Sequence, residues 1–307
     1  MINRILIRIK ILQIVYAHYQ KSATSLNNAE NELNRSLQTA YNLYHYLLLL
    51  IGILTDMEQK KIDSLQYKFL FSEEDRNPNL RFANNRLAEE LRTNEALEKF
   101  ANQYGHLWDE DDRVLLQNLR KEILESTIYQ EYLQQEDNYE ADRKIWYNIF
   151  KNIILTNESF LESLEEKNIY WQDDFETIGS FALKTIKRIE ENNPQQMLFS
   201  MFRDDDDRRF ALTLLHKTIH EKDESSELIN RQIKNWDLER IASIDLYIMQ
   251  MALAEIKNFP EIPINVSLNE YIELARYYST PKSALFINGI LDKVVTALQK
   301  EGKLFKN

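Results

Sequence analysis

The sequence predicts an all-α protein, and two observations support that prediction. The chain has 307 residues but only 5 glycines and 5 prolines, whereas ordinary usage would give roughly 21 and 15. Strand-rich folds spend these residues on many turns, so their scarcity favours long helices joined by few turns. Apolar residues also recur at helical spacing along most of the chain. The length suits one large domain or two smaller ones.

The composition also excludes several classes of site. The chain has no cysteine, which excludes disulfides, thiolate metal sites and cysteine nucleophiles. Its glycines are never closer than 13 residues apart, so no glycine-rich phosphate loop can be written. None of the 49 acidic residues lies in a recognisable catalytic motif. We therefore expect a protein that is not an enzyme and that binds no cofactor and no metal.

Charge is distributed unevenly along the chain. The net charge is −11, yet no acidic residue precedes Glu30, and the first 29 residues include Arg4, Arg8, Lys10 and Lys21. A basic end on an acidic chain is compatible with a local phosphate-binding surface, although four cations near a terminus also arise by chance.

No export signal or membrane span is apparent. Arg8 and Lys10 interrupt the apolar run at the start of the chain, and no small-residue cleavage site follows. The most apolar run, residues 46–54, has nine residues, well below the ~20 that span a bilayer. We therefore expect a cytoplasmic protein with no membrane association.

The first predicted helix covers residues 3–22. One apolar stripe contains Ile5, Ile9, Leu12 and Tyr16, and a second stripe on another side runs through Ile7, Ile11 and Ile14. A helix that is apolar on two faces is expected to lie between two partners. A second helix is predicted for residues 25–54. After a turn-rich break at 72–79, helices are predicted around residues 80–104, 110–136 and 141–165.

The last hundred residues give the clearest helix boundaries. The acidic run at residues 204–207 is expected to open a helix, because acids suit a helix N-terminus. A helix from 238 to 256 ends at the prolines of the 258–263 segment. Ser267 and Glu270 have the spacing of a capping box, and Pro281 is expected in the first turn of the last helix. Gly289 lies inside that helix, where close approach of another helix would justify it.

Two further patterns each have two interpretations. His216 and His220 are four residues apart and could share a metal, but no third ligand is evident, so a solvated helix face is the preferred interpretation. At an offset of 65 residues, Asp142 pairs with Asp207 and Trp171 with Trp236. Either one helix–loop–helix unit is used twice, or two amphipathic helices share a similar pattern.

Both ends of the chain resemble one known family. Arg8 followed by LQIVYA at 12–17 is similar to the first helix of the bacterial transcription antitermination factor NusB family. The C-terminal match is more specific, because its motifs occur in the family's order and at tight spacing. These motifs are WDLERI at 236–241, MALAEI at 251–256, IP at 262–263, NEYIELA at 269–275 and SALFINGILD at 283–292.

The resemblance implies the architecture and the function. It implies a helical core built from residues 1–20 and 205–307, with residues 21–204 as a helical insertion. Members of the family pair with NusE, a small-subunit ribosomal protein, bind the single-stranded boxA element of nascent ribosomal RNA, and act with the transcription elongation complex. The resemblance implies an acid facing NusE at Asp245. The RNA-binding residues that it implies are Arg4, Arg8, Gln13, Tyr16, Lys282, Ser283, Phe286 and Asn288.

Elementary physics agrees in outline with these RNA contacts. Single-stranded RNA is held by cations along its backbone and by aromatic faces on which bases stack. Tyr16 and Phe286 also lie at apolar helical positions, where core packing is the alternative. The first helix has fewer arginines than the family usually has, which predicts weaker RNA binding with a shallow salt dependence. A helical protein-interaction scaffold that has lost RNA binding is therefore the competing hypothesis.

Overall fold

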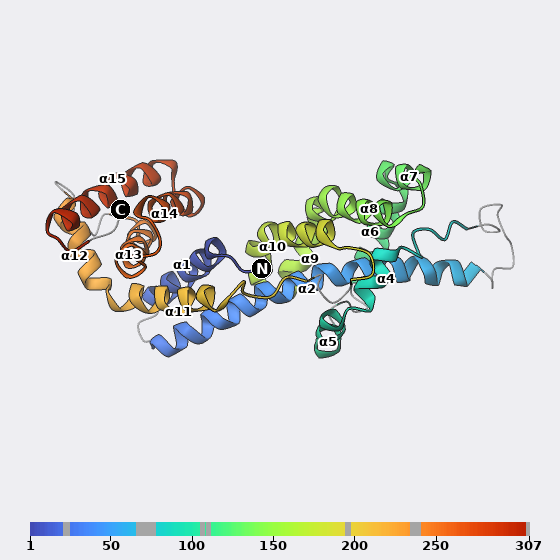
Figure 1. Ribbon diagram of the computed structural model, residues 1–307, viewed down its shortest axis with the longest axis horizontal. Coiled ribbons are helices and arrows are strands. Elements are labelled where there is room, and N and C mark those ends of the chain that lie inside the picture. The colour runs from blue at the N-terminus through green and yellow to red at the C-terminus, as the bar shows by residue number, and fades with distance from the viewer. Residues whose placement is uncertain are drawn as a thin grey trace. The chain divides into compact units, whose positions relative to one another are not determined.

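The computed structural model describes residues 1–20, 25–65, 78–104, 108, 112–193, 198–233 and 241–304. Within these ranges the regular elements are fourteen α-helices and one short 3₁₀ helix, and no strand is present (Figure 1). The all-α prediction is confirmed. The contacts divide the chain into two compact units, which are described separately. Unit 1 is Met1 with Gln38–Met201, and unit 2 is Ile2–Leu37 with Phe202–Asn307.

Unit 1 is built mainly from short helices. They pack against the later part of α2 (Leu26–Leu65), the longest helix. The other elements of unit 1 are α4 (Arg86–Arg92), α5 (Glu95–Gln103), α6 (Arg113–Glu125), α7 (Thr127–Gln134), α8 (Tyr139–Asn152), η1 (Ile154–Thr156), α9 (Glu158–Lys167) and α10 (Ile169–Arg188).

Asparagine side chains set many of these helix starts. Asn85, Asn94, Asn138, Asn157 and Asn168 each accept a backbone amide in the first turn of the helix that follows. An N-cap of this kind satisfies an amide that has no partner inside the helix. The broad helical regions predicted for residues 80–165 are therefore divided into several short helices.

α2 is long and apolar enough to be compared with a membrane span. It has 40 residues with a mean hydropathy of 1.2 over its most apolar window, of which 61% is buried inside the structure. Leu43, Leu47, Leu50, Ile51 and Leu54 are fully buried in unit 1. The apolar side chains are thus used in protein packing, so length and composition are only weak evidence for a membrane helix.

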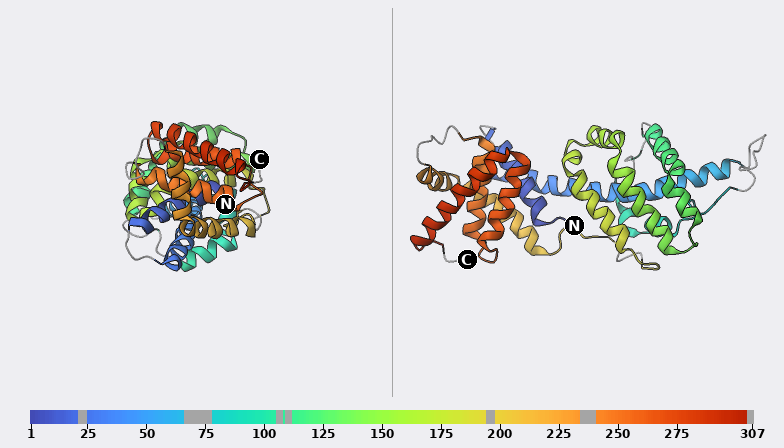
Figure 2. Two further views of the ribbon diagram at one scale, coloured as in Figure 1. Left: turned by 90° about the vertical axis from the view of Figure 1, so that its left-hand side faces the viewer. Right: turned by 90° about the horizontal axis from the view of Figure 1, so that it is seen from above.

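In unit 2, one central helix is surrounded by the other helices. α13 (Ser243–Asn258) contacts α11 (Asp205–His220), α12 (Lys222–Gln232), α14 (Ile264–Tyr278) and α15 (Pro281–Lys300), and α1 (Arg4–Gln20) packs against α11 and α13 (Figures 1 and 2). Every residue of α13 from Tyr247 to Ile256 is buried. This helix is buried on all sides because it has a neighbour on each side, and the buried stretch includes the polar Gln250 and Glu255.

The two apolar stripes predicted for α1 differ in how far they are buried. Ile7, Ile11 and Ile14 are buried as expected, but Ile5 and Tyr16 of the other stripe are exposed, at 52% and 42%. α1 is packed between neighbours in its middle turns, and the ends of the first stripe reach solvent.

Helix starts in unit 2 follow the sequence in two places. Asp204 is the N-cap of α11, and its carboxylate accepts the amide of Asp207 at 3.1 Å. α15 begins at Pro281 with Thr280 as its N-cap, which accepts the amide of Ser283 at 3.1 Å. Both the acid-led start and the proline start are confirmed.

Two predictions about the last helices are wrong. α14 begins at Ile264, directly after Pro263, so Ser267 lies inside the helix and forms no capping box with Glu270. A Cβ at Gly289 would meet no described atom within 4 Å, so close helix approach does not explain that glycine. In both cases the sequence has the residues that the motif requires, but the folded structure does not form the motif.

The repeat hypothesis gains one parallel between the two units. Asp142 on α8 accepts Arg86 Nε at 2.6 Å, and Asp207 on α11 accepts Arg4 Nε at 3.2 Å. The second pair of the offset, Trp171 and Trp236, cannot be compared, because Trp236 lies outside the described residues. Both interpretations of the 65-residue offset stay open.

Candidate nucleic-acid interface

Arg8 is buried at the junction of α1, α13 and α14. Its side chain donates to both carboxylate oxygens of Glu255, from Nε at 2.8 Å and from Nη2 at 2.9 Å, and Nη1 donates to Glu270 at 3.0 Å. Ser267 and Tyr271 add hydroxyl bonds to the Glu255 carboxylate, at 2.7 and 3.0 Å. Glu255 is fully buried, and its four hydrogen bonds satisfy it.

The protonation states in this cluster are fixed by burial and charge. Burial alone would lower the pKa of Arg8, but the hydrogen bond and negative charge of Glu255 outweigh it and raise that pKa. Burial and then the charge of Glu255 raise the pKa of Tyr271 well above its usual value. Arg8 is therefore charged and Tyr271 is neutral at any ordinary pH. The cluster is a bidentate buried ion pair that holds α1 against α13 and α14.

Arg8 therefore differs from the sequence-based expectation. Its residue is only 4% exposed and its guanidinium already binds two carboxylates, so it is placed to orient α1 rather than to touch a ligand. No local pattern indicates this role, because Glu255 and Glu270 are 247 and 262 residues away along the chain.

Arg4 lies one turn earlier and is more accessible. Its side chain is 28% exposed, pairs with Asp207 at 3.2 Å, and lies over the ring of Phe210 with 4.7 Å to the ring centre. Because Nε faces Asp207, part of the positive charge is already balanced. The aromatic contact holds the side chain along the surface of α11.

Tyr16 belongs to an aromatic cluster at the other end of α1. Its ring meets Tyr247 edge-on at 6.0 Å, Tyr19 meets Tyr247 at 5.0 Å, and the Lys222 ammonium lies 4.2 Å from the centre of the Tyr19 ring. Tyr16 is the exposed member of this cluster, at 42%. Sequence reasoning missed Tyr19 and Lys222, because α1 and α12 are adjacent only in the folded unit.

The start of α15 presents the C-terminal candidates. Lys282 is exposed, Ser283 is half-buried and contacts the Thr280 hydroxyl at 2.9 Å, and Phe286 is half-buried one turn later. The N-terminus of a helix also attracts anions through its free amides.

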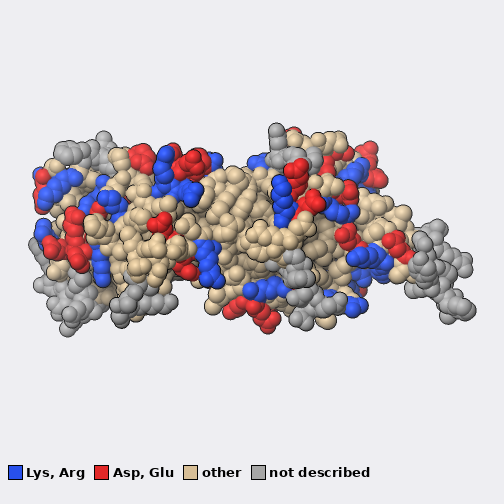
Figure 3. All heavy atoms as spheres, turned by 90° about the horizontal axis from the view of Figure 1, so that it is seen from below, with Lys and Arg blue, Asp and Glu red and all other residues tan. Residues whose placement is uncertain are grey.

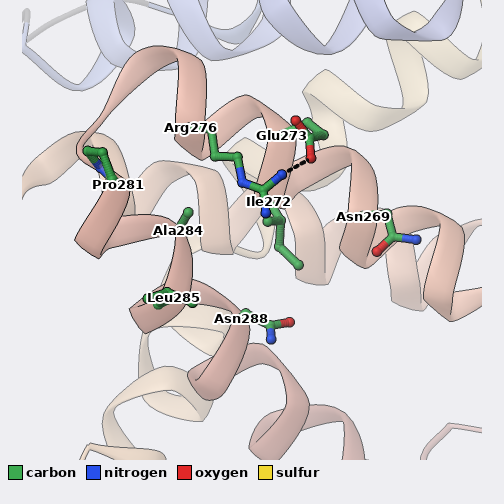
Figure 4. Close-up of a pocket in the computed structure, with 8 residues that line it drawn as sticks. All are labelled: Asn269, Ile272, Glu273, Arg276, Pro281, Ala284, Leu285 and Asn288. Carbon is green, nitrogen blue, oxygen red and sulfur yellow. Dashed lines mark hydrogen bonds and ion pairs between the residues drawn. The ribbon is translucent and has the colours of Figure 1, made fainter.

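A groove of about 480 Å³ runs between α14 and α15. Each helix contributes four residues at i, i+3, i+4 and i+7, the spacing of a single helix face. Asn269 and Asn288 lie at one end of the groove, and Arg276 and Pro281 at the other, with Arg276 paired to Glu273 (Figure 4). Leu285 is 76% exposed at its edge. Of these residues, only Asn288 is among the RNA contacts that the resemblance implies.

The remaining candidates are Gln13 and Asp245. Gln13 is half-buried on α1. Asp245 is 5% exposed and accepts the Ser279 hydroxyl at 2.5 Å, which ties α13 to the turn before α15. Asp245 therefore differs from the surface acid that the resemblance implies. Its carboxylate is used inside the unit.

The face of the molecule drawn in Figure 3 has no large patch of a single charge sign among its described residues. On the face drawn in Figure 3, basic and acidic side chains are interspersed among uncharged ones. The two histidines show no shared ligand: His216 Nε2 lies 2.9 Å from Glu30 Oε2, and His220 is exposed. Among the residues that the structure describes, no group of three or more His, Asp or Glu side chains has the arrangement of a metal site.

Comparisons with known proteins agree on one family. The NusB family model matches residues 177–296, from within α10 to within α15. A transcription antitermination protein NusB of Salinibacter ruber is 36% identical over 132 residues, which cover 41% of this chain and 82% of that protein. The Geobacillus kaustophilus protein of the same name is 36% identical over 121 residues, which cover 39% of this chain and 93% of that protein. No solved structure matches the chain.

Proposed function

Because this chain belongs to the NusB family, we propose that it is a non-enzymatic transcription antitermination factor that binds boxA-type single-stranded RNA together with NusE. The RNA surface in this proposal is formed by the exposed part of α1, the start of α15 and the groove between α14 and α15. Arg4, Tyr16, Lys282 and Phe286 are proposed direct contacts. Within the groove, the proposed direct contacts are Asn269, Arg276 and Asn288. Arg8 acts by holding α1 against α14.

The groove between α14 and α15 is the observation that carries the proposal. Carboxamide side chains can read a base edge through paired donor and acceptor atoms, and Asn269 and Asn288 place two of them at one end of the groove. Unpaired bases also stack on arginine planes and aromatic rings, for which Arg276 and Phe286 are available. The exposed ammonium of Lys282 lies beside the groove residue Pro281 in sequence, where it can neutralise a phosphate.

A fluorescence anisotropy titration with boxA RNA, with and without NusE, tests the proposal. Asn288→Ala is expected to cost about 1–3 kcal/mol of binding free energy if its amide reads a base. Lys282→Ala is expected to weaken binding of all sequences and to make the salt dependence shallower. Lys60→Ala, an exposed cation on α2 in unit 1, is the matched control and is expected to change nothing. Equal affinity for boxA and a scrambled RNA would contradict the proposal.

Two observations favour the alternative of an interaction scaffold without RNA binding. Arg8 is buried in an ion pair and Arg4 is partly balanced by Asp207, so α1 offers little free positive charge. The same titration separates the hypotheses: a scaffold binds NusE while showing no affinity for boxA RNA, alone or in the complex.

A further inference from the structure

Unit 1 contains a groove that the proposed RNA surface does not use. It lies between α2 on one side and α4 and α5 on the other, with a volume of about 200 Å³. Its apolar lining includes Leu48 and Ile53 of α2, Leu91 of α4, and Leu97 and Ala101 of α5. A space of this size accommodates one or two aliphatic side chains of a partner, the usual form of an anchor pocket.

Gly52 keeps this groove open. It lines the groove in the interior of α2, where glycine costs roughly 1 kcal/mol relative to alanine. A Cβ at this position would meet no described atom within 4 Å, so internal packing does not require the glycine. A side chain at this position would therefore extend toward the groove that Gly52 lines. The glycine at this position therefore leaves space in the groove and is not needed for packing inside unit 1.

The charges around the groove select the kind of partner. Asp56 and Glu98 line the groove, and Arg92, the one cation among its described lining residues, is paired with Asp56 at 3.0 Å and with Glu89 at 2.6 Å. The segment Gln38–Met201 of unit 1 has 30 acidic and 18 basic residues, whereas unit 2 has 19 acidic and 20 basic residues. The excess negative charge of the chain thus lies in the unit that holds this groove. Such a field favours basic partners and repels nucleic acid.

We propose that the groove between α2, α4 and α5 is a docking site for a protein partner, and that its occupant is an amphipathic helix whose apolar face is flanked by basic residues. Apolar side chains at i and at i+3 or i+4 enter the groove over Gly52, and the flanking lysines or arginines face Asp56 and Glu98. This is helix-in-groove recognition. The site is separate from the RNA surface, so it brings a second macromolecule to an RNA-binding factor without competition for the same residues.

The test uses the full chain and two designed helical peptides of about 16 residues, long enough to form a helix. Both peptides carry the same leucine face, and their flanking positions are all lysine in one and all glutamate in the other. Fluorescence anisotropy measures binding to the wild type and to four variants. Gly52→Leu fills the groove, Gly52→Ala fills it partly, and Glu98→Gln removes an edge charge. Gln38→Leu adds the same leucine elsewhere on α2, at an exposed position.

The lysine peptide is expected to bind the wild type at least about tenfold more tightly than the glutamate peptide. Gly52→Leu is expected to weaken that binding by at least about tenfold, Gly52→Ala and Glu98→Gln by less, and Gln38→Leu not at all. Thermal unfolding checks that each variant is folded. If Gly52→Leu unfolds, the Gly52→Ala and Glu98→Gln variants decide.

Three results would overturn the docking site. They are no binding of the lysine peptide, equal binding of both peptides, and lysine-peptide binding that is insensitive to filling the groove. The last result would mean that only a general charge attraction operates. None of these results bears on boxA binding, because no groove variant changes a residue of unit 2.

Discussion

Among single residues, the buried carboxylate of Glu255 has the most far-reaching contacts, because it connects three helices of unit 2. It joins α13, which carries it, to Arg8 of α1 and to Ser267 and Tyr271 of α14. Two charges taken out of water are stabilising only when geometry and hydrogen bonds are complete, and here every carboxylate oxygen is used. The cluster therefore makes the position of α1 specific.

Glu255→Gln is expected to lower the free energy of unfolding by about 3–5 kcal/mol, because the buried Arg8 charge loses its bidentate partner. Urea denaturation measures the change. Glu273→Gln removes an exposed carboxylate that pairs with Arg276 on α14, and it is expected to cost less than about 1 kcal/mol. A loss below about 1 kcal/mol for Glu255→Gln would mean that the cluster does not stabilise unit 2.

His45 is expected to make the folding stability of unit 1 depend on pH. Burial lowers its pKa, and a hydrogen bond with the Tyr41 carbonyl opposes this only in part. The unfolded chain therefore binds a proton more readily than the folded one. The stability that His45 contributes is complete above its unfolded pKa, near 6.5, and is lost as the pH falls from there through the folded pKa.

Urea unfolding at about pH 7.5 and about pH 5.5 tests this for the wild type and for His45→Phe. Phenylalanine keeps an aromatic ring against Phe100, whose ring centre is 4.9 Å away, but it does not titrate. The variant is expected to lose less stability than the wild type between the two pH values. An equal loss would show that His45 does not titrate differently on folding.

At the scale of elements, the two glycines of the last helix have opposite roles. Gly289 is inside α15 with no close neighbour, whereas Gly302 follows the helix at φ +67°. There the Gly302 amide donates to Gln299 O at 3.1 Å and the Lys303 amide to Leu298 O at 2.9 Å. These two bonds form a Schellman motif, which needs a left-handed residue.

Alanine at these two positions is therefore expected to have effects of opposite sign. Gly289→Ala should raise the free energy of unfolding by up to about 1 kcal/mol through helix propensity. Gly302→Ala should lower it by about 1 kcal/mol, because a Cβ is strained in the left-handed region. Denaturant titration of both variants compares them directly. A destabilised Gly289→Ala would indicate a contact at α15 that the free chain does not show.

At the scale of the whole molecule, charge is separated between the two units. The acidic unit 1 contrasts with a nearly neutral unit 2, so RNA affinity is expected to depend on few phosphate contacts. With Arg4 and Lys282 as the proposed phosphate contacts, the slope of log affinity against log salt is expected near −1.4, at ~0.7 per contact. Arg4→Ala with Lys282→Ala should bring it close to zero. A wild-type slope steeper than about −3 would require cations that the proposal does not name.

The helical class, the family, and the helix starts at Asp204 and Pro281 follow from the sequence alone, because composition, motif order and caps are local properties. The roles of Arg8, Ser267 and Asp245 depend on the folded structure. The sequence suggested an RNA contact, a capping box and a partner contact, respectively, but each side chain is buried against a carboxylate or hydroxyl of another helix or turn. The groove lined by Asn269 and Asn288 likewise exists only where two helix faces meet. Long-range packing decides which polar groups are desolvated, and a desolvated polar group must find its partner inside the fold.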